Sequence, residues 1–451
     1  KYGELVGSGF SKYKVAELLR DKYGFQGSAC TDWSVLNDGG TSWGVEDPNE
    51  WTPASRASLA VEVGVDQMGG CNDPQLLMTA YEDMVANLGE EQADANFRAS
   101  AKRLLLGYFN TGLFEDPYVD PDVARSTIDK EGGDEESEAA ALDAQVKGIV
   151  MLKNHDGVIK AAEGDAKPKV YVPMRYTAAY RSAPNRGTEW SDVAATCSLP
   201  LPQGTLENYF EVVTDTLAET LTGPADADGN PTPAEADITR LSAADIADCD
   251  YVVVCAAAPT NANERGGKDE SNAFIPLSNQ YRPYTADNEY VRQVSIAGDI
   301  LEDGTKENRS YYGKTSIMTN EVQLDQILQA AATAHEAGKP CIVILDIAKP
   351  MCVHEFESEV DAILVSMSSC TEAACRIIAG QDEPSGLLPM QMPKDMLDVE
   401  KQLEDVPRDM ECYTDADGNK YDFGFGLNYS GPISDERTEK YCVEPLTEPE
   451  A

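Results

Sequence analysis

Histidine, basic residues and long apolar runs are all scarce in this chain of 451 residues, and each scarcity excludes a class of protein. The three histidines, His155, His335 and His354, lie far apart in the sequence, and no CxxC motif accompanies them, so no zinc-site spacing is present. The longest apolar runs, such as residues 342–347, are much shorter than the roughly 20 residues of a membrane-spanning helix. We therefore predict no metal, no cofactor and no transmembrane segment.

Positive charge is outnumbered by more than two to one, with 36 basic and 79 acidic residues and a formal net charge of −43. Such a field repels the phosphates of nucleic acids and the headgroups of anionic membranes, so neither is expected as a partner. Acidic residues are most concentrated at 134–138 and in the tail at 436–450, where they suit solubility. A neutral sugar is compatible with this charge.

Eleven cysteines are present, and several stand inside apolar runs, as Cys255 and Cys341 do. A small buried thiol is the expected state of such residues. Free thiols favour a reducing cytoplasm over export, but the compartment stays open, because any signal peptide would precede Lys1. The chain begins without Met and reaches a strand-end motif within about 30 residues, so we expect an N-terminal portion to be missing.

The first hundred residues alternate helical and strand-like patterns. Apolar spacing predicts a helix at 14–23, a turn at 24–27 and a short strand at 28–31, and the order recurs as a helix at 55–62 and a strand at 63–67. Alternation of this kind is typical of parallel β/α units, whose site residues lie at the carboxyl ends of strands. Asp32 and Asp66 occupy such ends.

A Gly- and Pro-rich stretch separates this region from a second α/β region. We predict a linker at 112–136, an α/β sandwich domain at 137–433 and an acidic tail at 434–451. The four apolar runs predicted as strands are continuous rather than alternating, which is typical of a parallel sheet covered on both faces. The predicted strands are 169–172, 251–256, 341–346 and 362–366, and the predicted helices are 73–87, 94–108, 137–151, 206–221 and 321–337.

The sequence DADGN occurs at 226–230 and again at 415–419 and superficially resembles a calcium loop. Neither copy continues to the spaced acidic ligands and closing Glu of an EF-hand, so both are predicted to be ordinary turns. Likewise, Gly266-Gly267-Lys268 lacks the spacing of a phosphate-binding loop.

Hydrolysis of a glycosidic bond with retention requires two carboxyl groups about 5–5.5 Å apart, one to attack the anomeric carbon and one to protonate the leaving oxygen. Asp32 suits the first role because a strand end holds its short side chain rigidly. The adjacent Trp33 can shape the apolar side of a sugar pocket. A Thr-Asp-Trp tripeptide by itself, however, equally suits a surface turn.

Several ordered motifs, from about residue 14 to 433, resemble glycoside hydrolase family 3. LLRDKYGFQGSACTDWS is similar to the segment around the family's nucleophile, and GVDQMGG to the barrel strand that follows. Four later segments also resemble motifs of the family, in the expected order. They are ASAKRLLLGYFNTGLFEDPYVD, QVKGIVMLKN, EPSGLLPMQMP and YDFGFGLNYS. The resemblance implies the C-terminal part of a (β/α)8-type barrel at 1–111, followed by the α/β sandwich, with the active site between them.

The resemblance also implies a function, a retaining exo-β-glycosidase that hydrolyses terminal β-D-glucosyl or similar residues with Asp32 as nucleophile. The family's acid/base usually comes from the loop after a strand that matches 251–255, where Glu264 and Glu270 are the candidates. We favour Glu264 because it lies nearer the strand end, although both are also compatible with solvated loop acids. Trp33, Asp66 and Glu270 are expected to bind substrate.

Two functions remain open at this point. One is the hydrolase, and the other is a catalytically silent carbohydrate-binding or structural relative, which would share the same fold and motifs. In either case the expected partner is a carbohydrate, a β-glucoside or oligosaccharide, and a homodimer is an open alternative to a monomer.

Overall fold

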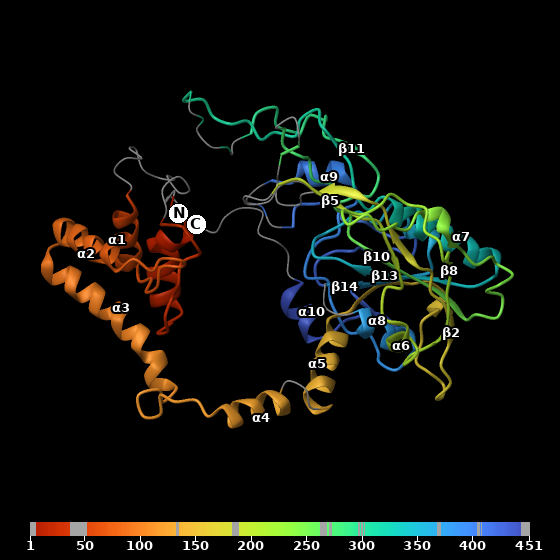
Figure 1. Cartoon of the computed structure of the whole chain (residues 1–451), viewed down its shortest axis with the longest axis horizontal. Helices are drawn as coiled ribbons and strands as arrows, with labels where there is room; N and C mark the ends of the chain where they lie inside the picture. Colours follow the sequence, from red (N-terminus) through yellow and green to blue (C-terminus); the bar gives the residue numbers. More distant parts are fainter. Residues whose placement is uncertain are drawn as a thin grey trace. The chain divides into compact units, whose positions relative to one another are not determined.

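The computed structural model describes residues 6–36, 52–131, 135–182, 189–261, 268–269, 273–295, 298, 301, 303–367, 371–403, 406 and 408–442. The chain divides into two compact units, Lys1–Gly132 and Gly133–Glu450 (Figure 1). Each unit is described by itself.

Unit 1 is built mainly from helices, which begin where the sequence provides caps. The Thr52 side chain accepts the Ser55 N–H before α1, and Asp73 accepts the Gln75 N–H before α2. The two strands predicted at 28–31 and 63–67 meet as a single parallel bridge between Cys30 and Gln67. The elements of unit 1 are η1 (Ser8–Phe10), the π-helix η2 (Lys12–Lys22), α1 (Pro53–Val63), α2 (Pro74–Leu88), α3 (Glu90–Asn110) and α4 (Pro121–Glu131).

Helix α4 lies inside the stretch 112–136 that was predicted as a linker, so this stretch is partly helical. The Asp120 side chain accepts the N–H groups of Asp122 and Val123 and thereby caps the helix, which starts at Pro121. A cap followed directly by proline outweighs the Gly and Pro residues that suggested an irregular chain.

Unit 2 contains an eight-stranded mixed sheet in the order β16-β15-β1-β14-β13-β10-β2-β7. The five strands from β14 to β7 are parallel, and β1 runs antiparallel to both β14 and β15. The sheet strands are β1 (Val150–Asn154), β2 (Lys169–Tyr171), β7 (Glu211–Val213), β10 (Tyr251–Ala257), β13 (Cys341–Asp346), β14 (Ala362–Ser366), β15 (Leu427–Asn428) and β16 (Gly431–Pro432).

Helices cover both faces of this sheet, which makes unit 2 an α/β sandwich (Figure 1). Helix α7 (Val322–Glu336) packs Leu324 and Ile327 into the core on one face. Helices α5 (Glu135–Gly148), α6 (Gln203–Leu206) and α8 (Thr371–Ile378) bury Val146, Leu206 and Ala374 on the other. The central strands β13 and β14 are buried along nearly their whole length, as their continuous apolar runs predicted.

Shorter elements border the sheet and form the loops described below. They are the strand pairs β3 (Arg175–Thr177) with β6 (Thr196–Ser198), β4 (Tyr180–Ser182) with β5 (Ser191–Val193), β8 (Thr216–Leu217) with β9 (Ile238–Thr239) and β11 (Tyr284–Thr285) with β12 (Thr315–Ser316), together with η4 (His155–Gly157), η5 (Glu235–Asp237), η6 (Glu357–Glu359), α9 (Met396–Lys401) and α10 (Glu436–Tyr441).

Three predictions about unit 2 are corrected by the structure. The sheet is mixed rather than wholly parallel, because β1 and β16 run against their neighbours. The helix predicted at 206–221 is wrong, since α6 ends at Leu206 and β7 and β8 follow, where β-branched Val and Thr residues favour strands. The helix predicted at 137–151 ends at Gly148, and β1 begins at Val150.

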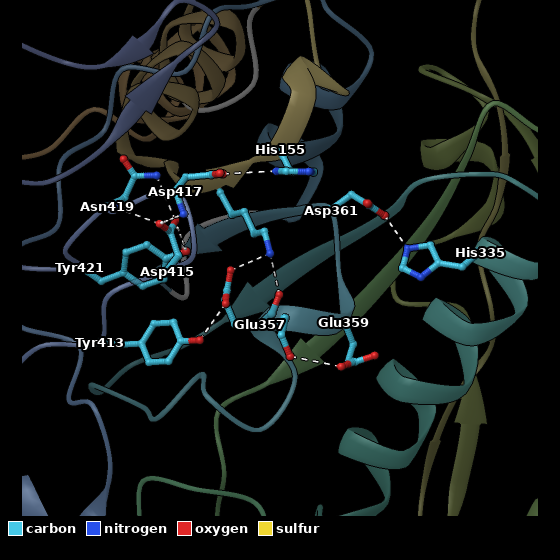
Figure 2. A network of polar contacts seen from close by, with 12 residues as sticks. His155, His335, Glu357, Glu359, Asp361, Tyr413, Asp415, Asp417, Asn419 and Tyr421 are labelled. Carbon is cyan, nitrogen blue, oxygen red and sulfur yellow. Dashed lines mark hydrogen bonds and ion pairs between the residues drawn. The ribbon is translucent and has the colours of Figure 1, made fainter.

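Both DADGN segments form the predicted turns. Asp415 Oδ1 accepts the N–H groups of Asp417 and Asn419 at 3.0 and 2.8 Å, and Asn419 Nδ2 donates to Asp415 Oδ2 at 2.9 Å (Figure 2). Asp226 makes the same bonds to Asp228 and Asn230. The carboxylate that resembled a calcium ligand is therefore used to close the turn.

A buried ion pair fastens β1 to η6. Lys153 Nζ lies 2.6 Å from Glu357 Oε1 and donates to the Glu357 carbonyl oxygen at 2.8 Å. Tyr413 Oη donates to the other carboxylate oxygen, Oε2, at 2.7 Å. Because each charge has partners, burial of this pair is tolerated. The lysine of the MLKN motif thus has a structural function.

The glycines of two family-like motifs lie where the chain passes close to other backbone. A Cβ at Gly386 would lie 2.3 Å from the carbonyl oxygen of Ile149, and one at Gly426 would lie 2.2 Å from that of Gly386. Both contacts are made by backbone atoms, which cannot move aside easily.

Gly386→Ala is therefore expected to lower the free energy of unfolding of the sandwich by about 1–3 kcal/mol, because the added methyl overpacks the site. Urea unfolding of the full protein measures this difference. Gly204→Ala is the matched control, since a Cβ at Gly204 meets no atom within 4 Å. Equal stability of the two variants would show that the close approach at Gly386 costs nothing.

The ten cysteines that the structure describes are all free thiols. Burial raises the pKa of several of them, and the pKa of Cys412 reaches about 11. No helix within the described ranges has the length and the apolar character needed for a bilayer crossing. The same residues contain no grouping of three metal-ligating side chains able to hold an ion.

Candidate active site

The backbone that leads to Asp32 is held by the neighbouring strand end. The Thr31 N–H donates to the Gln67 carbonyl oxygen at 2.9 Å, directly after the Cys30–Gln67 bridge. The Thr31 hydroxyl in turn accepts the Gly69 N–H at 2.8 Å. These bonds give Asp32 the rigid support that a strand end was predicted to provide.

The side chain of Asp32 is exposed and is oriented by its own neighbour. Its Oδ1 accepts the Trp33 N–H at 2.7 Å. Gly69 lies against this backbone so closely that an added Cβ would be 2.6 Å from the Thr31 carbonyl oxygen and 2.8 Å from that of Asp32. The first glycine after GVDQM is thus needed to let the two strand ends meet.

Trp33 is 76% exposed and therefore presents most of its indole to ligands. Its ring lies over Gly70, where an added Cβ would come within 2.7 Å of the Trp33 Cε3 atom. An exposed indole beside the exposed Asp32 suits contact with the apolar face of a sugar ring.

Asp66 is a buried anchor rather than a group open to a sugar, and this placement departs from the expectation that it binds substrate. Its side chain is fully buried, and its two oxygens lie 2.8 Å from Arg20 Nη2 and 2.7 Å from Arg103 Nη2. The Ala29 N–H donates to the same carboxylate at 3.0 Å. Protein donors thus occupy both oxygens, and Asp66 ties η2 and α3 to the strand that leads to Asp32.

Glu264 and Glu270, the two candidates for the acid/base, lie outside the described residues. The base of the loop that carries them is described. β10 ends at Ala257, and Asn261 Nδ2 donates to the Pro276 carbonyl oxygen at 2.9 Å, which closes the loop at its stem. The loop thus starts and ends at the carboxyl end of a central parallel strand, where ligands bind in open α/β sheets.

A cluster that we call the clamp fastens this loop to a long hairpin. Lys268 and Phe274 pair across the loop as an antiparallel bridge. Lys268 Nζ and Arg309 Cζ lie 4.8 and 5.3 Å from the centre of the Phe274 ring. Glu307 joins the two cations through hydrogen bonds from Lys268 Nζ and, at 2.9 Å, from Arg309 Nε.

The acid of the clamp is 14% exposed, and the hydrogen bond from Lys268 holds the pKa of Glu307 below its usual value. Glu307 and Arg309 lie between β11 and β12, in a part of the chain that is coloured green to teal in Figure 1. The sequence did not reveal the clamp, because Lys268 and Glu307 are 39 residues apart and no local pattern links them.

Comparison with known proteins gives a family match over most of unit 2. Residues 143–429 match the glycosyl hydrolase family 3 C-terminal domain. The chain is 23% identical over 439 residues to a probable β-glucosidase C of Aspergillus flavus, covering 96% of this chain and 50% of that protein. It is 36% identical over 170 residues to a periplasmic β-glucosidase/β-xylosidase of Dickeya chrysanthemi, covering 34% of this chain and 24% of that protein.

Solved structures share the fold. A β-glucosidase from Listeria innocua in complex with glucose aligns with a TM-score of 0.51 at 19% identity, over 94% of this chain and 50% of that one. A β-glucosidase from Erythrobacter marinus aligns with a TM-score of 0.51 at 19% identity, over 93% and 50%. The chain thus spans about half the length of the relatives that it matches from end to end.

Proposed function

Since this chain belongs to glycosyl hydrolase family 3, we propose that it forms part of a retaining exo-β-glycosidase that removes terminal β-D-glucosyl or similar residues. The observation that carries the proposal is the exposed carboxylate of Asp32 on a braced strand end, within a motif that resembles the family's nucleophile segment. The relatives named β-glucosidase and β-xylosidase support the substrate class.

Asp32 attacks the anomeric carbon as the bond to the leaving oxygen breaks, which gives a glycosyl ester of Asp32 with inverted configuration. A carboxylic acid from the loop after β10 gives its proton to that oxygen, so the aglycone leaves as a neutral alcohol or phenol. The resulting carboxylate then takes a proton from water, and the hydroxide attacks the same carbon. The second inversion restores the β configuration and frees Asp32.

Glu264 is our choice for the acid/base, and Glu270 is the alternative. In a Glu264→Ala variant of the full-length protein, an aryl β-glucoside with a good leaving group should give a burst of phenol followed by turnover slower by about 10²–10⁴-fold. The first step needs little protonation, whereas the second lacks its base. Azide, which attacks without a base, should restore turnover and yield the β-glucosyl azide.

The matched variant is Glu270→Ala, which should show neither a burst nor rescue by azide, because Glu270 is expected to bind substrate and not to act as the base. A burst in Glu270→Ala together with normal turnover in Glu264→Ala would exchange the two assignments. A wild-type full-length protein that binds glucosides without hydrolysing any of them would instead favour the catalytically silent carbohydrate-binding relative.

A further inference from the structure

Two turns follow the paired strand ends of unit 1, and a hydrogen bond joins them. The Ser34 N–H donates to the Gly69 carbonyl oxygen at 3.1 Å, just beyond the hydrogen bond between Thr31 and Gln67. Ser34 and Gly70 both have a left-handed backbone conformation, with φ of 62° and 71°. Glycine adopts this conformation freely, whereas it strains a residue that has a Cβ. Strain of the kind seen at Ser34 persists where the surroundings fix the backbone, and it is common at active sites.

The absent side chain of Gly70 makes room for the indole of Trp33. A Cβ added at Gly70 would lie 2.7 Å from Cε3 and 3.5 Å from Cζ3 of Trp33. These two atoms are neighbours on the outer edge of the six-membered ring, so Gly70 meets the edge of the indole. Because the side chain is 76% exposed, most of the ring stays accessible to a ligand.

The orientation of this indole matters because Trp33 directly follows Asp32. The Trp33 N–H donates to Asp32 Oδ1 at 2.7 Å, so the backbone between the two residues also orients the carboxylate. A sugar whose anomeric carbon meets that carboxylate can lay its apolar C–H face on the indole only if the ring stands at a suitable angle. A side chain as exposed as Trp33 has few packing neighbours, so its contact with Gly70 has a large share in setting this angle.

We propose that Gly70 is a positioning residue, which orients the indole of Trp33 so that it stacks on the sugar that Asp32 attacks. The inference rests on the proposed function. A side chain at position 70 would push the indole away from the turn, and the sugar would lose the stacking contact. This contact is made with the bound sugar both before and during the reaction, so its loss weakens binding and leaves the chemical step nearly unchanged.

Gly70→Ala in the full-length protein is expected to raise KM for phenyl β-glucoside about tenfold and to leave kcat nearly unchanged. Because alanine also strains a left-handed backbone, the matched control is Gly112→Ala. Gly112 has a φ of 72° and lies in unit 1 as well, but a Cβ there would meet no atom within 4 Å. The control variant should therefore keep the wild-type KM.

A double-mutant cycle shows whether the effect of Gly70 passes through the indole. Trp33→Ala should itself raise KM, and adding Gly70→Ala to it should change KM by less than about twofold, because no ring is left to displace. The affinity for phenyl 1-thio-β-glucoside, measured by calorimetry, should follow the same pattern without turnover. If Gly70→Ala does not fold, Gly70→Asn takes its place with Gly112→Asn as its control, since asparagine tolerates the left-handed conformation.

Three results would overturn the proposal: a KM in Gly70→Ala equal to that in Gly112→Ala, an equal rise in KM when Trp33 is already alanine, or a loss of kcat at unchanged KM. The last result would mean that Gly70 supports the backbone of Asp32 and not the indole. If the wild-type full-length protein hydrolyses no glucoside, the proposed function fails by itself. The affinities for the thioglucoside then decide about Gly70, and equal values for wild type and Gly70→Ala would overturn its role.

Discussion

Asp32→Asn is expected to lower kcat/KM of the full-length protein for aryl β-glucosides on the order of 10⁴-fold, because the neutral amide cannot form the glycosyl ester. Stability should be nearly unchanged, since the Asp32 side chain is exposed and its hydrogen bond is to the adjacent Trp33 N–H. Steady-state kinetics together with a thermal melt measures both quantities.

The same variant offers a positive readout of the mechanism. With azide present, Asp32→Asn should form the α-glucosyl azide, because a single direct displacement inverts the anomeric centre. Asp21→Asn, an equally exposed aspartate in unit 1, is the control and should keep wild-type activity. Retention of more than a tenth of the activity in Asp32→Asn would remove this residue from the role of nucleophile.

Asp66→Asn is expected to lower the free energy of unfolding of unit 1 by about 3–5 kcal/mol. The substitution removes the negative charge that both Arg20 and Arg103 contact and leaves two nearly buried guanidinium groups facing an amide. Because Asp66 also accepts the Ala29 N–H, the strand end that braces Asp32 should loosen, and activity should fall with stability. Urea unfolding, followed by fluorescence, measures the stability difference.

A solvent-exposed ion pair provides the comparison for this prediction. Asp129 lies 2.8 Å from Arg125 Nε on α4, but the two side chains are 58% and 76% exposed. Asp129→Asn should therefore cost less than about 1 kcal/mol. Similar losses in Asp66→Asn and Asp129→Asn would show that burial of the Asp66 cluster adds no stability.

Secondary structure was predicted most accurately for segments whose composition and length are compatible with a single type of element. Strands β13 and β14 have the bounds that were predicted, because an uninterrupted apolar run of five or six residues between polar flanks can only be a covered strand or a short buried helix, and its β-branched residues favour the strand. The segment 206–221 failed for a related reason. Its apolar spacing is also compatible with a helix, and only pairing of β7 with β2 decides between them.

The predictions for the two aspartates of the candidate site also differ in their outcome. The motif around Asp32 indicated a strand end that presents a carboxylate, and the structure places it on a braced and exposed turn. For Asp66 the sequence offered the same pattern, a carboxylate at a strand end, yet the structure buries it between two arginines. Arg20 and Arg103 stand 46 and 37 residues away, so no local pattern distinguishes the two aspartates.

The sequence by itself indicated the family, the α/β class, four of the eight strands of the sandwich sheet and the candidate nucleophile, because these depend on local periodicity and on short motifs. Tertiary structure alone decided the antiparallel course of β1, the burial of Asp66 and the clamp around Phe274. Each of these depends on which distant segments pack together, and the free energy of that packing is shared among residues that no sequence window contains.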